Sequence, residues 1–597
     1  MIERLLETIK GDIAEFLTAK GAEVDLVQIE RATDAAFGEY STNSAMKYAK
    51  ELGQNPLFLA EELVEFLNSK NYPELEKIEF VKPGFVNFFL TPAVKFAHVQ
   101  SVIAQGDEFG RSNILAGQKW VIEHTSPNPN KAMHIGHLRL NLIGMGIVRL
   151  TKWAGAEVVA DAVYNDRGIA IAKAMYGFLA HMRKSEAVLI DIAHFVSTPT
   201  DWYTPEEKNQ KPDYFVTDCY VKAEEDFKNN PEIESLVRQM VVDWEAKDEN
   251  IWKLWRHILQ YAYIGAERVL ARLGSHWDKV WYEHEHYQKG KDYVEQGLAS
   301  GVFKKLEDGA VLTDLEEVYN IPDTILLKKD GTSLYITQDI ALTDLKKKTY
   351  DADKLVWVVG PEQSLAMKQL FAVCEQLGIG KLSDFTHVSY GKVGLKNKAG
   401  EAVKMSSRDG TAILIDDLID EVRDTIKARF DAEERHPAEL RAELSEKLAL
   451  AAVKFSFLKS DKNQDMSFDV EQSVDVQGDS GLYVMYTYVR TQSIGRKAAG
   501  TSRADIIVPA AAGTEASLVR SLLYFNEVMA KSVADLSVHH VAQYLLEISS
   551  EFNSWYAKET ILDGSPAESY RLAIVQATGI CLKNGLAILG IETVDEM

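Results

Sequence analysis

The segment 120–150 constrains the fold of this chain more than any other stretch. Trp120-Val121-Ile122 is a short apolar run with β-branched residues, which predicts a buried strand. Apolar residues recur at helical spacing over 138–150. The loop between them therefore leads from a strand into the first turn of a helix. Such loops bind phosphates in α/β folds, because the helix N-terminal N–H groups carry partial positive charge.

The end of this loop carries a specific motif. His134 and His137 are three residues apart and share one helix face, and Gly136 between them lets an adenine or ribose approach the backbone closely. His134-Ile135-Gly136-His137 resembles the signature tetrapeptide of the class I aminoacyl-tRNA synthetases. The preceding Glu123-x-x-Ser126-Pro127-Asn128-x-x-Lys131 resembles the arginyl branch of that family.

A second signature lies far downstream. Val403-Lys404-Met405-Ser406-Ser407 resembles the basic loop with which class I synthetases clamp triphosphate, with Ser407 in place of the second lysine. In the arginyl branch a lysine before the first signature supplies that charge, and Lys131 holds its position. The resemblance implies that four residues are catalytic, namely His134, His137, Lys131 and Lys404. It implies that ATP contacts His134, Gly136, His137, Lys404, Ser406 and Ser407.

A candidate amino-acid site follows from residues near predicted strand and helix ends. Tyr335 and Asp339 are four apart, so on a helix they face the same way. A carboxylate with a phenol suits a guanidinium, whose fork of donors binds planar acceptors in pairs. The alternative for Asp339 is a charge that stabilises a helix N-terminus. Gln363 follows the buried strand predicted over 355–360, at the edge where open α/β sheets place ligands.

The resemblance extends this amino-acid site. It implies that arginine is held by Glu123, Asn128, Glu283, Tyr335, Asp339 and Gln363. Glu285 is the alternative to Glu283 if the register of the motif is shifted. Arg167 stands where the family has a tryptophan, between Asp166 and Gly168. This departure removes the base packing that the family assigns to that side chain, whereas Asp166 remains able to bind a ribose or an amine.

We expect a multidomain α/β protein. An N-terminal α+β domain (1–112) resembles the additional domain of the arginyl branch, which contacts the tRNA elbow. A Rossmann-type catalytic domain with a parallel sheet (113–430) contains a connective insertion near 184–320, and an all-α anticodon-binding domain (431–597) follows. Val24 to Ile29 is predicted as a strand, and the tryptophans at 244, 252 and 255 as core.

Candidate RNA contacts are carried over from the same resemblance. They are Phe85, Asn87, Tyr483, Tyr486, Arg490 and the terminal Met597. Aromatic residues can stack on unpaired bases, and amides can bond to base edges. The competing interpretation is ordinary packing, in the sheet for Phe85 and in a helical core for the tyrosines.

Composition excludes several classes of protein. The net charge of −23, from 66 basic and 89 acidic residues, argues against bulk nucleic-acid affinity but not against a folded RNA partner. Three distant cysteines predict neither a disulfide framework nor a cysteine-rich zinc site. We expect no membrane span, no structural metal, a cytoplasmic location and, from the family, a monomer.

The expected function is that of an arginine–tRNA ligase. It would use ATP with Mg²⁺ to form arginyl-adenylate and transfer arginine to tRNA(Arg). Two alternatives stay open: a small-molecule nucleotidyltransferase, which also uses a His-x-Gly-His site, and a catalytically silent tRNA-binding paralogue.

Overall fold

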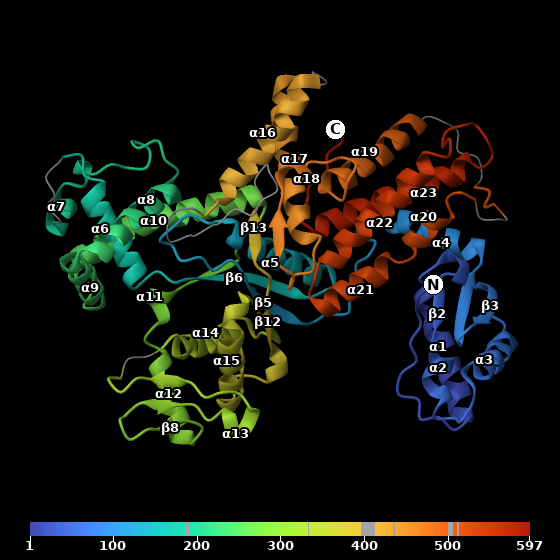
Figure 1. Cartoon of the computed structure of the whole chain (residues 1–597), viewed down its shortest axis with the longest axis horizontal. Helices are drawn as coiled ribbons and strands as arrows, with labels where there is room; N and C mark the ends of the chain where they lie inside the picture. Colours follow the sequence, from blue (N-terminus) through green and yellow to red (C-terminus); the bar gives the residue numbers. More distant parts are fainter. Residues whose placement is uncertain (186–190, 332–333, 396–411, 434–435, 500–505, 510–512) are drawn as a thin grey trace.

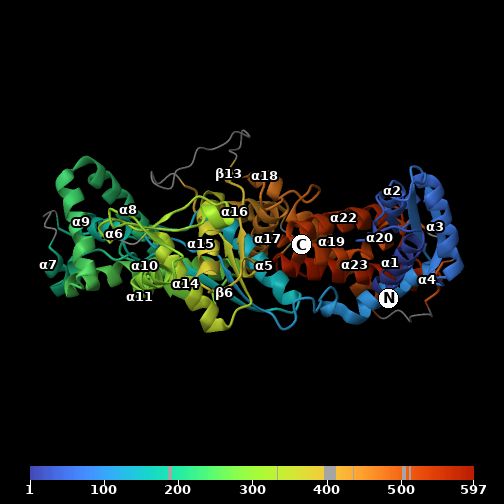
Figure 2. The same ribbon diagram turned by 90° about the horizontal axis from the view of Figure 1, so that it is seen from below.

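The computed structural model describes the chain except for residues 186–190, 332–333, 396–411, 434–435, 500–505 and 510–512. The molecule is elongated (Figure 2), with a group of helices at one end, an N-terminal unit at the other, and the central sheet and C-terminal helices between them. No helix in the described part is long and apolar enough to cross a membrane.

The central element is a five-stranded parallel sheet (Figure 1). Its strands are β5 (Lys119–Glu123), β6 (Glu157–Tyr164), β7 (Lys279–Tyr282), β11 (Lys354–Val358) and β12 (Phe385–Val388). They lie in the order β12-β11-β5-β6-β7, so the chain's progress across the sheet reverses between β5 and β11. Ligands bind outside the carboxyl ends of the strands at such a reversal. The predicted Rossmann-type fold is confirmed.

Both faces of this sheet are covered, which explains why its strands are continuous apolar runs. Val121 and Leu355 point to one face, where they pack with α14 (Tyr335–Tyr350) and α15 (Ser364–Gln376). Their neighbours Ile122 and Val356 point to the other face, toward α5 (Ile135–Trp153). This alternation fixes the register of β5, and therefore which side chains stand at its carboxyl end.

The segment 184–320, expected to be an insertion, is mostly helical but also contributes β7 to the central sheet. The helix that precedes this segment is α6 (Ile169–His181). The segment itself begins with α7 (Ile192–Ser197), α8 (Pro212–Asn229), α9 (Pro231–Glu245), α10 (Glu249–Leu273) and α11 (Glu283–His286). Trp244 and Trp252 stack with ring centroids 5.2 Å apart, and Trp255 packs against both, as their predicted core role requires.

A small antiparallel sheet packs with α14 and α15 in one hydrophobic cluster. It consists of β8 (Lys304–Lys305), β9 (Val311–Leu312) and β10 (Ile325–Leu327), with α12 (Gly290–Ser300) and α13 (Glu316–Tyr319) next to it.

The N-terminal unit is an antiparallel sheet of order β1-β2-β4-β3 with helices packed on it. Its elements are α1 (Ile2–Ala19), β1 (Glu30–Arg31), β2 (Tyr40–Thr42), α2 (Ser44–Ala49), α3 (Pro56–Lys70), β3 (Leu75–Val81), β4 (Phe85–Leu90) and α4 (Pro92–Gln105). The strand predicted over Val24 to Ile29 is wrong. Side chains take the place of a neighbouring strand there, since Lys47 and Tyr48 donate to the Leu26 carbonyl and Thr42 donates to that of Gln28.

The C-terminal part is helical. It comprises α16 (Ile415–Glu433), α17 (Ala438–Leu458), α18 (Val470–Ser473), α19 (Gly481–Ala498), α20 (Ala516–Leu522), α21 (Phe525–Asp535), α22 (His539–Tyr556) and α23 (Glu568–Ile588). Its helices share one hydrophobic core with α5, and Tyr524 extends into the N-terminal unit, where its hydroxyl donates to the Glu39 carbonyl at 2.7 Å. These shared contacts hold the three parts in one molecule.

Two glycines of α19 allow a matched test of this packing. A Cβ at Gly481 would lie 2.6 Å from the Ala451 carbonyl oxygen of α17, whereas a Cβ at Gly495 would meet nothing within 4 Å. We expect Gly481→Ala to destabilise the helical part by about 1–3 kcal/mol through overpacking. Gly495→Ala should stabilise it by about 0.5–1 kcal/mol through helix propensity. Differential scanning calorimetry measures both, and equal transitions for the two variants would contradict the packing described.

Candidate active site

The first signature caps α5 with its own histidines. His134 is the N-cap residue, and its Nδ1 accepts a hydrogen bond from the Gly136 N–H at 3.1 Å. The His137 Nδ1 in turn accepts from the His134 N–H at 3.2 Å, and the two ring centroids are 4.1 Å apart. Because both Nδ1 atoms accept, each neutral ring carries its proton on Nε2.

Burial and charge keep these rings neutral. Burial, assisted by the Lys131 ammonium, lowers the pKa of His134 to about 4. Burial, His134 and Lys131 hold the pKa of His137 well below its usual value. At neutral pH the two side chains therefore offer Nε2–H donors without a charge of their own, and Lys131 is the nearby cation.

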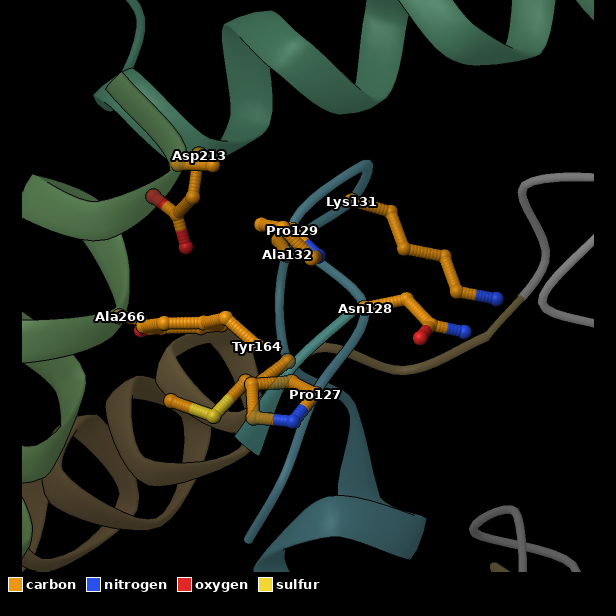
Figure 3. A pocket seen from close by; sticks show the side chains of 10 residues that line it. Pro127, Asn128, Pro129, Lys131, Ala132, Tyr164, Asp213 and Ala266 are labelled. Atoms are coloured by element: carbon orange, nitrogen blue, oxygen red, sulfur yellow. The ribbon is translucent and has the colours of Figure 1, made fainter. Parts of the chain in front are cut away.

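The loop that carries Lys131 is fixed from the insertion side. The Ala132 N–H donates to the Thr217 hydroxyl of α8 at 2.7 Å. Figure 3 shows the side chains of Lys131 and Asn128 extending to the same side of this loop, with Asp213 on the opposite side. The predicted phosphate-binding lysine and the predicted arginine-binding amide thus share one face.

The second signature falls outside the described residues, so Lys404, Ser406 and Ser407 are not placed. Its flanks are described. The Ile135 N–H donates to the Ile413 carbonyl at 3.0 Å and the Ile415 N–H to that of Met133 at 3.1 Å. The chain that leaves the second signature is therefore paired with the first.

Arg139 of α5, which no sequence motif singled out, links α5 to a turn beside the N-terminal flank of the second signature. Its Nη2 lies within hydrogen-bonding distance of the carbonyls of Asp461, Lys462 and Gln464. That turn leads into β14 (Met466–Phe468), which pairs in parallel with β13 (Val393–Leu395), just before the second signature. A buried arginine one turn into a helix gives no periodic signal that separates it from a surface residue.

Three predicted arginine-site carboxylates gather at the reversal point of the sheet. Glu123 ends β5 and is buried, Glu283 begins α11 and is buried, and Asp339 lies on α14. Burial raises the pKa of Asp339 to about 7, with Glu123 and Glu283 close enough to raise it further. Burial likewise raises the pKa of Glu283 to about 7. Raised pKa values of this kind are typical of buried carboxyl groups that lie close together in a ligand-binding site.

A cavity of about 560 Å³ opens beside Glu283, whereas Glu123 and Asp339 do not line it. Its walls include three of the predicted arginine-site residues, Asn128, Glu283 and Tyr335, together with Arg167 and Lys328. Tyr335 is 77% exposed and forms part of the rim. Glu285 is exposed, so burial favours Glu283 over that alternative.

Lys346 is the component that the sequence did not reveal. Its side chain is 1% exposed, and its ammonium lies 2.7 Å from Glu123 Oε2 and 2.8 Å from Asp161 Oδ2. Trp281 of β7 also donates to Asp161, at 2.7 Å. In the sequence, Lys346-Lys347-Lys348 is typical of a solvated helix face, and only the carboxylates at the end of β5 and inside β6 hinted at a buried cation.

Two further residues differ from expectation. Asp166 does not await a ligand, because it is fully buried and accepts hydrogen bonds from the His284 N–H, the His284 ring and the Tyr263 hydroxyl. Gln363 is exposed in the short 3₁₀ turn after β11. It stands at the carboxyl edge of the sheet but does not line the cavity.

The predicted RNA contacts lie far from this cleft, in the N-terminal and C-terminal parts. Phe85 is 36% exposed, whereas Asn87 is 1% exposed within β4, so the Asn87 amide is inaccessible to a base in this structure. Phe85 and Asn87 point to the same face of β4, but Asn87 is paired on both sides, opposite Ser41 of β2 and Glu79 of β3, and the local sequence does not show which strands flank it. Tyr486 is exposed and Arg490 donates to its hydroxyl at 2.8 Å, while Tyr483 and Met597 are half-buried.

Comparison with known proteins agrees with this geometry. The family described as tRNA synthetases class I (R), catalytic domain, matches residues 98–470. The DALR anticodon binding domain matches 484–597, and the arginyl tRNA synthetase N terminal domain matches 3–90.

Full-length relatives are similar as well. The arginine–tRNA ligase of Treponema denticola is 32% identical, with 92% of this chain and 91% of that protein covered. That of Porphyromonas gingivalis is 31% identical over 96% of each. This chain belongs to the arginyl-tRNA synthetase family.

The architecture matches solved arginyl-tRNA synthetases too. The Thermus thermophilus enzyme superposes with a TM-score of 0.80 at 24% identity, covering all of both chains. The Plasmodium falciparum enzyme gives 0.78 at 19% identity, covering 99% of each. The fold is therefore that of an arginyl-tRNA synthetase, and the family is that of an ATP-dependent arginine–tRNA ligase.

The two raised carboxyl pKa values give this synthetase a predicted pH dependence. A carboxyl group is neutral below its pKa, so lowering the pH from 8 to 6 removes negative charge from Asp339 and Glu283. We expect the KM for arginine to rise about tenfold or more over this range. The KM for ATP should change less than about threefold, because His134 and His137 are already neutral. Initial rates of tRNA charging measure both constants, and an arginine KM independent of pH would contradict the prediction.

Proposed function

We propose that this chain activates L-arginine with ATP in the cleft at the carboxyl ends of β5, β6 and β7, and transfers the arginyl group to the terminal adenosine of tRNA(Arg). The observation that supports this most strongly is the meeting of two environments at one sheet reversal. Neutral histidines lie at the start of α5, Asn128 on the loop before it lines the same cavity as Glu283, and Glu123 and Glu283 are close enough to Asp339 to raise its pKa.

The carboxylate side suits the substrate's guanidinium. A planar cation with five donors can form charge-assisted hydrogen bonds with buried carboxylates, which repel one another when no cation is bound. We assign the guanidinium to Asp339 and Glu283, with Glu123 beneath and Tyr335 at the rim. Asn128 and Gln363 would hold the α-amino and carboxylate groups. Amino acids without the guanidinium leave these carboxylates unpaired and are rejected, so we propose that no separate proofreading site is needed.

The histidine side suits the triphosphate. We assign the Nε2–H groups of His134 and His137 to the α-phosphate, where charge develops as the arginine carboxylate attacks. Lys131 and Lys404 would neutralise the departing pyrophosphate, with Ser406 and Ser407 beside it, and Mg²⁺ would arrive with ATP. Gly136 keeps this surface open, because a Cβ there would lie 3.0 Å from the His134 ring. No covalent intermediate with the protein forms, so catalysis is positioning and charge stabilisation.

The tRNA would be held at both ends of the molecule. We propose the domain division 1–112, 113–430 and 431–597, with Phe85 stacking at the elbow and Asn87 reaching a base only after a local rearrangement. Tyr486 and Arg490, with Tyr483 and Met597 nearby, would meet the anticodon. The 2′-hydroxyl of the terminal adenosine would accept the arginyl group. We propose a monomer in the cytoplasm.

Asp339 offers a matched test, because Asp351 lies at the C-terminal end of the same helix and is 93% exposed at its side chain. We expect Asp339→Asn to raise the arginine KM at least about 100-fold, equal to about 2.8 kcal/mol, since a guanidinium loses a buried charged partner. Asp351→Asn should leave it unchanged. Steady-state tRNA charging supplies the arginine KM, and ATP binding should stay within about twofold in both variants.

Arginine-dependent pyrophosphate release, with and without arginine-accepting tRNA, separates the proposal from its alternatives. Release in the absence of arginine would indicate a small-molecule nucleotidyltransferase. No release under any condition would indicate a silent tRNA-binding paralogue. An unchanged arginine KM in Asp339→Asn would remove Asp339 from the site.

A further inference from the structure

Arg167 lies on the wall of the substrate cavity, in the loop between β6 and α6. Its Nη2 lies 2.8 Å from Glu245 Oε1, at the C-terminal end of α9. Its guanidinium also sits over the Tyr287 ring, 4.2 Å from the centroid. The remaining arm, Nη1, lies 3.9 Å from Glu283 Oε1. Three groups thus fix a cation beside a carboxylate that we assign to the substrate.

The neighbouring residues set this register. Asp166 accepts from both the backbone N–H and the ring of His284, at 3.1 and 2.6 Å. Because Asp166 precedes Arg167 and His284 follows Glu283, this pair of bonds brings Arg167 opposite Glu283. The proximity of Arg167 to Glu283 therefore follows from the hydrogen-bonded contact between the β6 loop and α11.

The charges around Glu283 come from several elements. Asp166 from the β6 loop and Asp339 from α14 are the nearby carboxyl groups, Lys328 lines the same cavity, and His284 and His286 lie on its own helix. Lys346 is bonded to Glu123 and Asp161. Burial and Asp166 raise the pKa of Glu283, and Arg167 lowers it. The Arg167 guanidinium thus opposes the effects that would neutralise this carboxylate.

We propose that Arg167 is a positioning residue that holds the Glu283 carboxylate in place, and ionised, for the guanidinium of the arginine substrate. Glu245 and Tyr287 keep Arg167 itself on the wall, so that it supports Glu283 without filling the substrate's place. The inference rests on the proposed function. It gives a role to the arginine that this chain carries where the family has a tryptophan.

The test replaces Arg167 by methionine, which keeps an unbranched apolar stem and removes the charged guanidinium. Arg238 provides the matched control, because it lies on α9, forms an ion pair with Glu234 one helical turn away at the surface, and does not line the cavity. We expect Arg167→Met to raise the arginine KM about tenfold at pH 7, with kcat changed less than about twofold. Arg238→Met should leave both constants unchanged.

The pH profile distinguishes this role from a merely structural one. Without Arg167, Glu283 needs a higher pH to ionise, so the acidic limb of kcat/KM for arginine should shift upward by about one pH unit. The variant should approach the wild-type KM at pH 8.5. Arg167→Lys should restore part of the shift, because it keeps the charge.

A double-mutant cycle with Glu283→Gln tests whether Arg167 acts through Glu283. If it does, adding Arg167→Met to Glu283→Gln should raise the arginine KM less than about twofold. Additive effects, or a wild-type pH profile in a folded Arg167→Met, would overturn the inference; if that variant does not fold, Arg167→Gln, which also removes the charge, and the cycle built on it decide in the same way. A wild-type protein that does not charge tRNA with arginine would instead refute the proposed function.

Discussion

The buried ammonium of Lys346 between Glu123 and Asp161 is the interaction on which the cleft depends. Glu123 and Asp161 lie opposite each other on adjacent parallel strands, so their carboxylates repel each other, and burial makes both charges costly unless a cation lies between them. Breaking such a buried group by removing one member costs about 3–5 kcal/mol. Lys346 therefore binds α14 to the sheet through β5 and β6.

The same contact places the substrate-facing carboxylate. Asp339 precedes Lys346 by seven residues on α14, which is two helical turns, so both lie on one face of the helix. Because Lys346 is fixed over the sheet, Asp339 on the same helix face lies in the cleft. Lys346 pairs with both Glu123 and Asp161, Arg167 lies beside Glu283, and the further cation at Asp339 and Glu283 is the one we assign to the substrate. The cleft thus divides into an acidic half and, at the start of α5, a half with neutral donors and Lys131.

Residues in local patterns could be predicted from the sequence. The strand, loop and helix from β5 to α5 follow from apolar spacing, and the signature histidines identify the family. Contacts between distant segments could not be predicted: Lys346 resembles a surface lysine, Arg139 has no periodic signal, and β7 is a four-residue strand inside a helical segment. Asn87 shows the same limit, because its motif suggested a contact while the strands on both sides of β4 bury it. Asp166 was considered able to bind a ribose or an amine, yet it is already hydrogen-bonded to His284 from another element.

The most direct test of the acidic cleft is a crystal structure with a non-hydrolysable arginyl-adenylate analogue. We expect the guanidinium within hydrogen-bonding distance of Asp339, and the phosphate group beside the Nε2 atoms of His134 and His137. A guanidinium bound away from Asp339 and Glu283, or a phosphate outside the start of α5, would contradict the central claim.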